Sequence, residues 1–282
     1  MNSIKDLIKQ ASDYLKDKEI ADFDIDSWLL AEHVFQITRA KIYLFSDMKA
    51  DESKAEKYFE LIKKRAEHIP LQHLTGIQEF MGMEFIVNEH VLIPRQDTET
   101  LVEEVIRYIN QRENIVKVLD MCTGSGCIGI SIDKICDNVQ VEAVDISEEA
   151  LCVAEKNNIK HSGNVNFILS DMFDNIDRKY DVIVSNPPYI ETAEVEKLMP
   201  EVREHEPLIA LDGTEDGLKF YRIICENLKK YLSEEGAVFF EIGYNQGETV
   251  PEILRQNGFD NIKVIKDLSG NDRVVVAYRK KA

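Results

Sequence analysis

The sequence predicts an α/β fold with a mostly parallel, doubly wound sheet, preceded by a small helical domain. Two patterns carry this prediction. From Val116 onward, short apolar runs of strand length alternate with stretches of helical periodicity. Before Gly76, in contrast, glycine is absent and apolar residues recur at helical spacing. A chain of 282 residues is long enough for both domains.

Residues 1–75 are expected to form the helical domain. Asp26 is predicted to cap its second helix, and Pro70 to stop a later one. The first helix is indicated by apolar residues that share one face, namely Ile4, Leu7, Ile8, Ala11 and Leu15.

Residues 76–96 are expected to form a linker hairpin. The apolar runs at 80–87 and 91–93 predict two short strands, and the polar residues 88–90 between them predict the turn. Asp97 or Thr98 is then predicted to cap the helix that opens the next domain.

Residues 97–282 are expected to form the sheet domain. Its strands read as continuous apolar runs, which are typical of strands buried on both faces of a parallel sheet. The chain ends in a hairpin, 262–265 and 274–278, so the last strand is expected to be antiparallel. The predicted parallel strands are Val116–Asp120, Val139–Asp145, Val165–Leu169, Asp181–Ser185 and Ala237–Ile242.

The composition argues against several classes of function. A net charge of -18 disfavours a direct nucleic-acid partner, which needs a basic surface. No apolar run is long enough to span a membrane, and the N-terminus lacks the pattern of a secretory signal, so we expect a cytoplasmic protein. The five cysteines and six histidines show no paired spacing, so neither a disulfide nor a metal site is expected.

A glycine-rich turn follows the first strand of the predicted sheet. Glycines allow a ligand to approach the backbone closely, and Asp145, which ends the next strand, is spaced to reach ribose hydroxyls. The spacing G-x-G-x-x-G also fits a dinucleotide. Asp120, however, would suit the ammonium group of a methionine moiety better than a pyrophosphate. S-adenosylmethionine is therefore the preferred cofactor, with capping of the turn as the alternative role for Asp120.

A second motif, Asn186-Pro187-Pro188-Tyr189, follows the fourth strand, where ligands bind in open α/β folds. The prolines offer only carbonyl oxygens, and Asn186 adds a side-chain carbonyl. Two fixed acceptors suit the two N–H bonds of a planar NH₂ group, and Tyr189 can lie against its flat face. We therefore expect Asn186 and Pro187 to be catalytic, in the methylation of an amide or aromatic amine.

At these residues the chain resembles the HemK/PrmC family, which methylates the glutamine of the Gly-Gly-Gln motif in class I release factors of translation termination. The resemblance extends over nearly the whole chain. It includes Pro70–Gly76, Phe80–Gly82, Val91–Glu99, Glu206-Pro207, Ala210–Gly213, Glu215–Leu218 and Glu241–Gly243.

The resemblance implies a Rossmann-like class I methyltransferase that binds S-adenosylmethionine and a class I release factor, which the helical domain of residues 1–75 would help to dock as the substrate. Asn186 would contact both cofactor and substrate, and Pro187, Pro188 and Tyr189 would complete the substrate clamp. The chain departs from the family at Cys122 and Thr214, where glycine is usual, and at His73, where an aromatic residue is common. The cofactor residues are then expected to be Asp120, Cys122, Thr123, Gly124, Ser125, Gly126, Asp145, Asp171, Met172 and Asn186, with Asp171 at the adenine amino group.

Three other functions fit parts of the sequence. An N6-adenine methyltransferase acting on DNA or RNA would use the same pair of acceptors, but it needs a basic channel. A nicotinamide-dependent dehydrogenase would use the glycine loop, and a binding module could keep the fold without catalysis.

Arg95 could either form a structural ion pair or orient the substrate.

Overall fold

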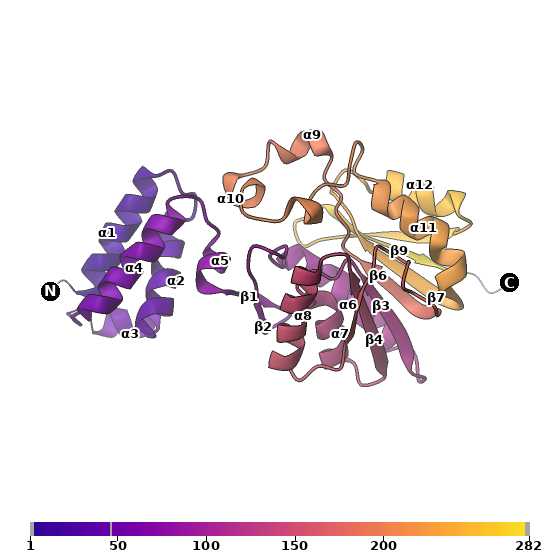
Figure 1. The fold of residues 1–282 in the computed structure, drawn as a ribbon, viewed down its shortest axis with the longest axis horizontal. Coiled ribbons are helices and arrows are strands. Elements are labelled where there is room, and N and C mark those ends of the chain that lie inside the picture. The colour runs from indigo at the N-terminus through magenta and orange to yellow at the C-terminus, as the bar shows by residue number, and fades with distance from the viewer. Residues whose placement is uncertain (1–2, 46, 280–282) are drawn as a thin grey trace. The chain divides into compact units, whose positions relative to one another are not determined.

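The computed structural model describes residues 3–45 and 47–279, which form two compact units (Figure 1). The first unit contains the chain up to Ile77 together with Met199–His205. The second contains Gln78–Leu198 and the chain from Glu206 onward. The expected linker hairpin therefore belongs almost entirely to the second unit. Within residues 3–45 and 47–279, no helix is long and apolar enough to cross a membrane.

The first unit is helical. Ser3 caps its first helix, because the Ser3 hydroxyl accepts from the Asp6 amide and the Asp6 carboxylate accepts from Ser3 in return. The buried faces of these helices form one core that includes Leu15, Trp28 and Tyr58. The helices are α1 (Ile4–Asp17), α2 (Phe23–Phe35), α3 (Arg39–Leu44), α4 (Glu52–Arg65), α5 (Leu71–Thr75) and, from much later in the sequence, α10 (Pro200–Arg203).

Asp26 does not cap a helix, which corrects the expectation from sequence. Helix α2 begins at Phe23, so Asp26 lies inside it, where its buried carboxylate accepts from Arg65 Nε at 2.6 Å. Arg65 also binds Glu201 of α10, with Nη1 3.1 Å from Oε1. Burial raises the pKa of Asp26, and the Arg65 guanidinium opposes that shift. A buried ion pair between distant segments thus replaces the local cap.

The second unit is built on a seven-stranded sheet of order β5-β4-β3-β6-β7-β9-β8. The first five strands in this order are parallel, whereas β9 pairs antiparallel with both β7 and β8. This arrangement confirms the predicted fold class. The strands are β3 (Val116–Met121), β4 (Val139–Asp145), β5 (Asn166–Leu169), β6 (Tyr180–Ser185), β7 (Leu232–Glu241), β8 (Asn261–Lys266) and β9 (Asp272–Tyr278).

Helices cover both faces of this sheet. Alternate side chains of each buried strand point to opposite sides, so both faces are apolar and each is buried against helices. Val118 and Val182 pack with α6 and α7 on one face, whereas Leu119 and Ile183 pack with α11 and α12 on the other (Figure 1). The helices of this unit are η1 (Gln96–Thr98), α6 (Glu99–Ile109), α7 (Cys127–Ile135), α8 (Glu148–Lys160), α9 (Thr192–Val195), η2 (Leu208–Ala210), α11 (Lys219–Tyr231) and α12 (Thr249–Gln256).

The hairpin before η1 has a different turn from the one expected. Its strands are β1 (Ile77–Phe80) and β2 (Met83–Ile86), joined at Met81 and Gly82. Both turn residues have positive φ, 51° and 71°, as primed hairpin turns require. The run 91–93 forms no strand, and Val91 is instead buried against α8. The apolar pattern gave the burial correctly but placed the turn too late.

We predict that Arg65→Met destabilises the first unit by about 3 kcal/mol, because it leaves the buried Asp26 carboxylate without its partner. Lys64→Met is the matched control, because Lys64 forms only an exposed pair with Glu60 on the same helix. Trp28, the single tryptophan, is buried in this unit, so its fluorescence during urea unfolding reports the stability of this unit. Equal midpoints for the two variants would contradict the role assigned to the ion pair.

Candidate active site

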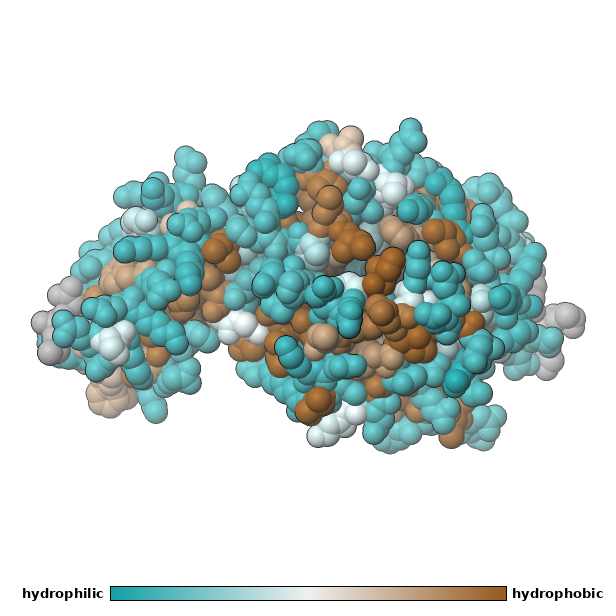
Figure 2. Space-filling model, viewed as in Figure 1, coloured by the Kyte–Doolittle hydropathy of each residue, from teal (hydrophilic) through white to brown (hydrophobic). Residues whose placement is uncertain are grey.

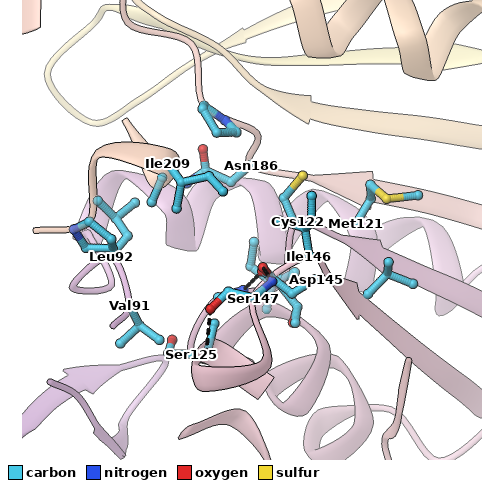
Figure 3. Close-up of a pocket in the computed structure, with 18 of the residues that line it drawn as sticks. Val91, Leu92, Met121, Cys122, Ser125, Asp145, Ile146, Ser147, Asn186 and Ile209 are labelled. Atoms are coloured by element: carbon cyan, nitrogen blue, oxygen red, sulfur yellow. Dashed lines mark hydrogen bonds between the residues drawn. The ribbon is translucent and has the colours of Figure 1, made fainter. Parts of the chain in front are cut away.

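A cavity of about 280 Å³ opens at the carboxyl ends of the central parallel strands (Figure 3). Open α/β sheets bind ligands at this edge, where the chain turns outward on either side of the first strand. Here β4 and β6 lie on the two sides of β3. The cavity is lined by Cys122 after β3, Asp145 at the end of β4, Asp171 after β5 and Asn186 after β6.

The glycine loop, Cys122–Gly126, forms one wall of this cavity through Cys122, Thr123, Gly124 and Ser125. Gly126 does not line the cavity but begins helix α7 in the left-handed conformation, with φ of 80°. A Cβ atom at Gly126 would lie 2.9 Å from Cδ1 of Ile130, so a side chain would strain the turn and crowd the helix. The backbone conformation and the packing of α7 therefore require glycine at this position.

Cys122 lies where the backbone would favour glycine. Its φ is 62°, which is uncommon for a residue with a side chain. Burial raises the pKa of its thiol well above the usual value, and the Asp145 charge acts in the same direction. The thiol therefore stays protonated at neutral pH and is a poor nucleophile. Its contribution to the cavity is shape.

Asp120 lies beneath the glycine loop and does not line the cavity, contrary to the position expected beside a cofactor ammonium group. The residue is fully buried, and its Oδ2 accepts from Thr123 Oγ1 at 2.6 Å and from the Gly129 amide at 3.0 Å. Among the residues that the structure describes, Oδ1 has no hydrogen-bond partner. Burial raises the pKa of Asp120 to about 7. Its contacts match the alternative reading, in which Asp120 holds the turn.

Asp145 joins the loops that follow two neighbouring strands. Its Oδ2 accepts from the Gly124 amide at 2.8 Å, and its Oδ1 accepts from the Ser147 amide at 3.0 Å (Figure 3). Asp145 also lines the cavity, and a carboxylate has two oxygens that can accept from a vicinal diol. Burial raises the pKa of Asp145, and backbone hydrogen bonds from Ser147, Gly124 and Ile146 oppose that shift.

Asp171 and Met172 both line the cavity, as expected. Met172 has a φ of 45°, so this loop, like the glycine loop, holds a side chain in the left-handed region. Ser170 fixes the loop, because its hydroxyl donates to the Met172 carbonyl at 3.1 Å and accepts from the Asn175 amide at 2.9 Å. Together with Asp145, Asp171 gives this part of the cavity a negative charge.

The Asn-Pro-Pro-Tyr motif is only partly exposed to the cavity. Asn186 and Pro188 line it, whereas Pro187 and Tyr189 do not. The Asn186 Nδ2 atom donates to Thr98 Oγ1 at 3.4 Å. The Tyr189 hydroxyl points to the end of β7, where it donates to Glu241 Oε1 at 3.3 Å. The Tyr189 side chain therefore holds the end of the motif to β7 and does not line the cavity.

The cavity also has residues that were not predicted from sequence. Its apolar lining includes Leu92, Ile146, Ile209 and Phe220, and Figure 2 shows hydrophobic side chains on this face of the second unit. Ile146 follows Asp145 directly and could have been found from that position. Leu92 lies in the run 91–93, which was predicted as a strand and not as part of a site, and no motif marks Ile209 or Phe220 as a site residue.

Arg95 forms the ion pair considered from sequence, and its position in the cavity lining leaves a role in orienting the substrate as a prediction. It lines the cavity, and its Nη2 donates to Glu206 Oε1 at 2.6 Å. Burial raises the pKa of Glu206, and Arg95 opposes that shift.

The described part of the chain contains no cluster of three or more acidic, histidine or cysteine side chains arranged to hold a metal ion.

Two family models match the chain: the PrmC N-terminal domain over residues 6–76 and the methyltransferase small domain over residues 97–203. The release factor glutamine methyltransferase of Clostridium acetobutylicum is 40% identical over 281 residues, which are 98% of this chain and 98% of that protein. The protein of the same name from Geobacter sulfurreducens is 37% identical, over 97% of this chain and 95% of its own. A methyltransferase structure from Pyrococcus furiosus, 17% identical, covers 71% of this chain and 91% of its own at a TM-score of 0.51, a likeness of fold alone.

We predict that Asp120→Asn changes how stability depends on pH. The raised pKa of Asp120 means that its contribution to stability is present below about pH 4 and is lost as pH rises through about 7. The free energy of unfolding of the variant, minus that of the wild type, should therefore increase by about 2 kcal/mol between pH 5.5 and pH 8. Urea unfolding followed by circular dichroism measures this difference, and a difference that stays constant would show that Asp120 does not titrate in this range.

Proposed function

Because the chain belongs to the family of release factor glutamine methyltransferases, we propose that it transfers a methyl group from S-adenosylmethionine to a glutamine side-chain nitrogen of a class I release factor. We further propose that this glutamine is the one in the Gly-Gly-Gln motif. The observation that carries the proposal is the meeting of Asp145 and Asn186 in one cavity, a diol acceptor beside an amide acceptor.

The cavity suits S-adenosylmethionine in charge and in hydrogen bonding. S-adenosylmethionine, when bound, supplies an electrophilic methyl group on a sulfonium centre. Asp145 would hold the ribose hydroxyls, and Asp171 would accept from the adenine amino group. The two carboxylates and the apolar wall around Ile146 and Met172 would favour a cationic nucleoside over a pyrophosphate.

The chemistry asks the protein mainly to orient a poor nucleophile. The lone pair of an amide nitrogen is delocalised, so the nitrogen reacts only when it is held in line with the methyl carbon. Asn186 Oδ1 would accept one N–H bond from within the cavity, and the carbonyl of Pro187, a residue outside the cavity lining, is proposed to accept the other; both would stabilise the positive charge that develops on nitrogen. The nitrogen gains the methyl carbon while the methyl–sulfur bond breaks, and the electron pair of that bond stays on sulfur as a neutral thioether. The nitrogen then loses one proton, which has become acidic, to water, so no strong base is required.

The first unit is proposed to help dock the release factor. It matches the PrmC N-terminal domain, and it exposes the apolar side chains of Ile25, Tyr43, Leu44 and Phe45. Exposed apolar residues in such number commonly mark surfaces for protein partners.

The proposal is tested by mass spectrometry of a purified class I release factor after incubation with the enzyme and S-adenosylmethionine. A gain of one methyl group on the Gly-Gly-Gln glutamine supports it. Labelled methyl transfer to DNA or RNA, with none to the release factor, would overturn it in favour of an N6-adenine methyltransferase. The net charge of -18 favours the protein substrate.

We predict that Asn186→Ala lowers kcat for methyl transfer at least 100-fold, because it removes one of the two acceptors that hold the amide. Asn110→Ala is the matched control, because Asn110 is exposed at the end of α6. Both variants should unfold at the same temperature as the wild type. Turnover by the Asn186 variant close to that of the wild type would contradict the proposed mechanism.

We predict that Asp145→Ala weakens S-adenosylmethionine binding by about 2 kcal/mol, through the loss of charge-assisted hydrogen bonds to the ribose. Isothermal titration calorimetry gives the affinity, with the exposed Asp177→Ala as control. Unchanged affinity would place the ribose elsewhere. Because Asp145 also binds the Gly124 and Ser147 amides, part of the loss should come from loosening of these two loops.

A further inference from the structure

Glu241 is a buried carboxyl group close to the active site that lines no part of the cavity. It is 2% exposed at the end of β7, and its Oε1 accepts from the Tyr189 hydroxyl at 3.3 Å. Within residues 3–45 and 47–279, its Oε2 has no hydrogen-bond partner. A buried carboxylate with an unsatisfied oxygen lowers stability, so a role in the reaction would account for its presence here.

Thr98 connects Glu241 to Asn186. The Thr98 side chain is buried, and its Oγ1 accepts from Asn186 Nδ2 at 3.4 Å. Burial raises the pKa of Glu241 to about 6, and the Thr98 hydroxyl, which faces the carboxyl group, opposes that shift. The distances from Asn186 Nδ2 to Thr98 Oγ1 and from the Tyr189 hydroxyl to Glu241 Oε1, 3.4 and 3.3 Å, are long for hydrogen bonds, so each contact is weak alone. Their importance lies in the direction that they impose.

The direction follows from which groups can donate. An ionised carboxylate only accepts, so the Tyr189 hydroxyl donates to Glu241, and the Thr98 hydroxyl that faces Glu241 must turn its hydrogen toward the carboxylate. The Thr98 oxygen then has only lone pairs left for Asn186. Asn186 must therefore turn its NH₂ group toward Thr98, which leaves its carbonyl oxygen free. The opposite amide orientation would place two oxygens against each other.

We propose that Glu241 is a positioning residue for methyl transfer: through Thr98 it fixes the amide orientation of Asn186, and through Tyr189 it holds the end of the motif. This inference rests on the proposed function, because it assigns the freed oxygen of Asn186 to the NH₂ group of the substrate. It gives a role in the reaction to Thr98 and Glu241, which lie in two of the segments that resemble the family.

A purely structural role for Glu241 would be to hold Arg273 of β9, but Arg273 has other partners. Its Nη2 lies 3.1 Å from Asp267 Oδ2 and 3.2 Å from Asp97 Oδ2. The groups that face Glu241 are Thr98 and Asp97 of η1, Tyr189 after β6, and Arg273, while Tyr221 of α11 donates to its backbone carbonyl at 2.7 Å. Only Thr98 and Tyr189 lead from Glu241 to the substrate motif.

The test compares Glu241→Gln with Glu142→Gln. Glu142 is the matched control, because it accepts from the Tyr180 hydroxyl at 2.5 Å, near the opposite end of the sheet domain from the motif. We expect Glu241→Gln to lower kcat 10- to 100-fold, with the S-adenosylmethionine affinity unchanged within twofold and the unfolding temperature no lower than that of the wild type at pH 8. Glu142→Gln should keep kcat within threefold.

Two further measurements separate positioning from folding. Thr98→Val, which keeps the shape but removes the hydroxyl, should reproduce the loss, Thr98→Ser should recover most of the activity, and the double variant with Glu241→Gln should lose no more than either single one. In the wild type kcat should fall as pH drops through about 6, since protonated Glu241 can itself donate. This fall should be absent in Glu241→Gln.

A kcat within threefold of wild type for Glu241→Gln would overturn the inference. So would equal activities of Thr98→Val and Thr98→Ser, which decides the matter even if the Glu241 variant does not fold. All activities are ratios to the wild type on the substrate that the wild type methylates. A wild type that methylates nucleic acid and not the release factor therefore contradicts the proposed function, while the ratios still test Glu241.

Discussion

The register of three parallel strands is the constraint on which the site depends. Met121 of β3 lies opposite Val144 of β4 on one side and Ser185 of β6 on the other. The next residue of each strand, or the first one after it, is therefore Cys122, Asp145 or Asn186, and these three emerge together at one edge of the sheet. A shift of one residue in either pairing would turn these side chains toward the helices, because successive side chains point to opposite faces.

The same edge concentrates features that lower stability elsewhere in proteins. Cys122 and Met172 hold side chains at positive φ within the cavity wall, and burial raises the pKa of Asp120, Asp145 and Glu241. Strain and buried charge persist only where surrounding structure fixes them. Here the surrounding structure is a sheet with helices on both faces, whose two apolar cores are large enough to offset these costs.

Features that are marked by neighbouring residues could be predicted from the sequence, whereas roles that depend on a partner distant in the sequence could not. The strand runs, the glycine loop and Asn186 could be located because each is marked by neighbouring residues. The role of Asp26 could not, because its partner Arg65 is 39 positions away, and an acidic residue near a helix start is ordinarily a cap. Asp120 was assigned to a ligand for the same reason. Its position at a strand end was correct, but the direction of its side chain depends on Gly129, a helix residue whose amide it accepts.

Gly213 and Gly217, which come from two of the segments that resemble the family, both pack against the loop that carries Tyr189. A Cβ atom at Gly213 would lie 2.7 Å from the Tyr189 Cα, and one at Gly217 would lie 2.3 Å from the Tyr189 carbonyl oxygen. The segment that follows the motif therefore returns and packs directly on its backbone, where Gln246 Nε2 also donates to the Tyr189 carbonyl at 3.1 Å. Glu241 holds the Tyr189 side chain while these residues hold its main chain. With Asn186 fixed by Thr98 at the other end, both ends of the proline corner are held, so the oxygens between them are oriented before a substrate arrives.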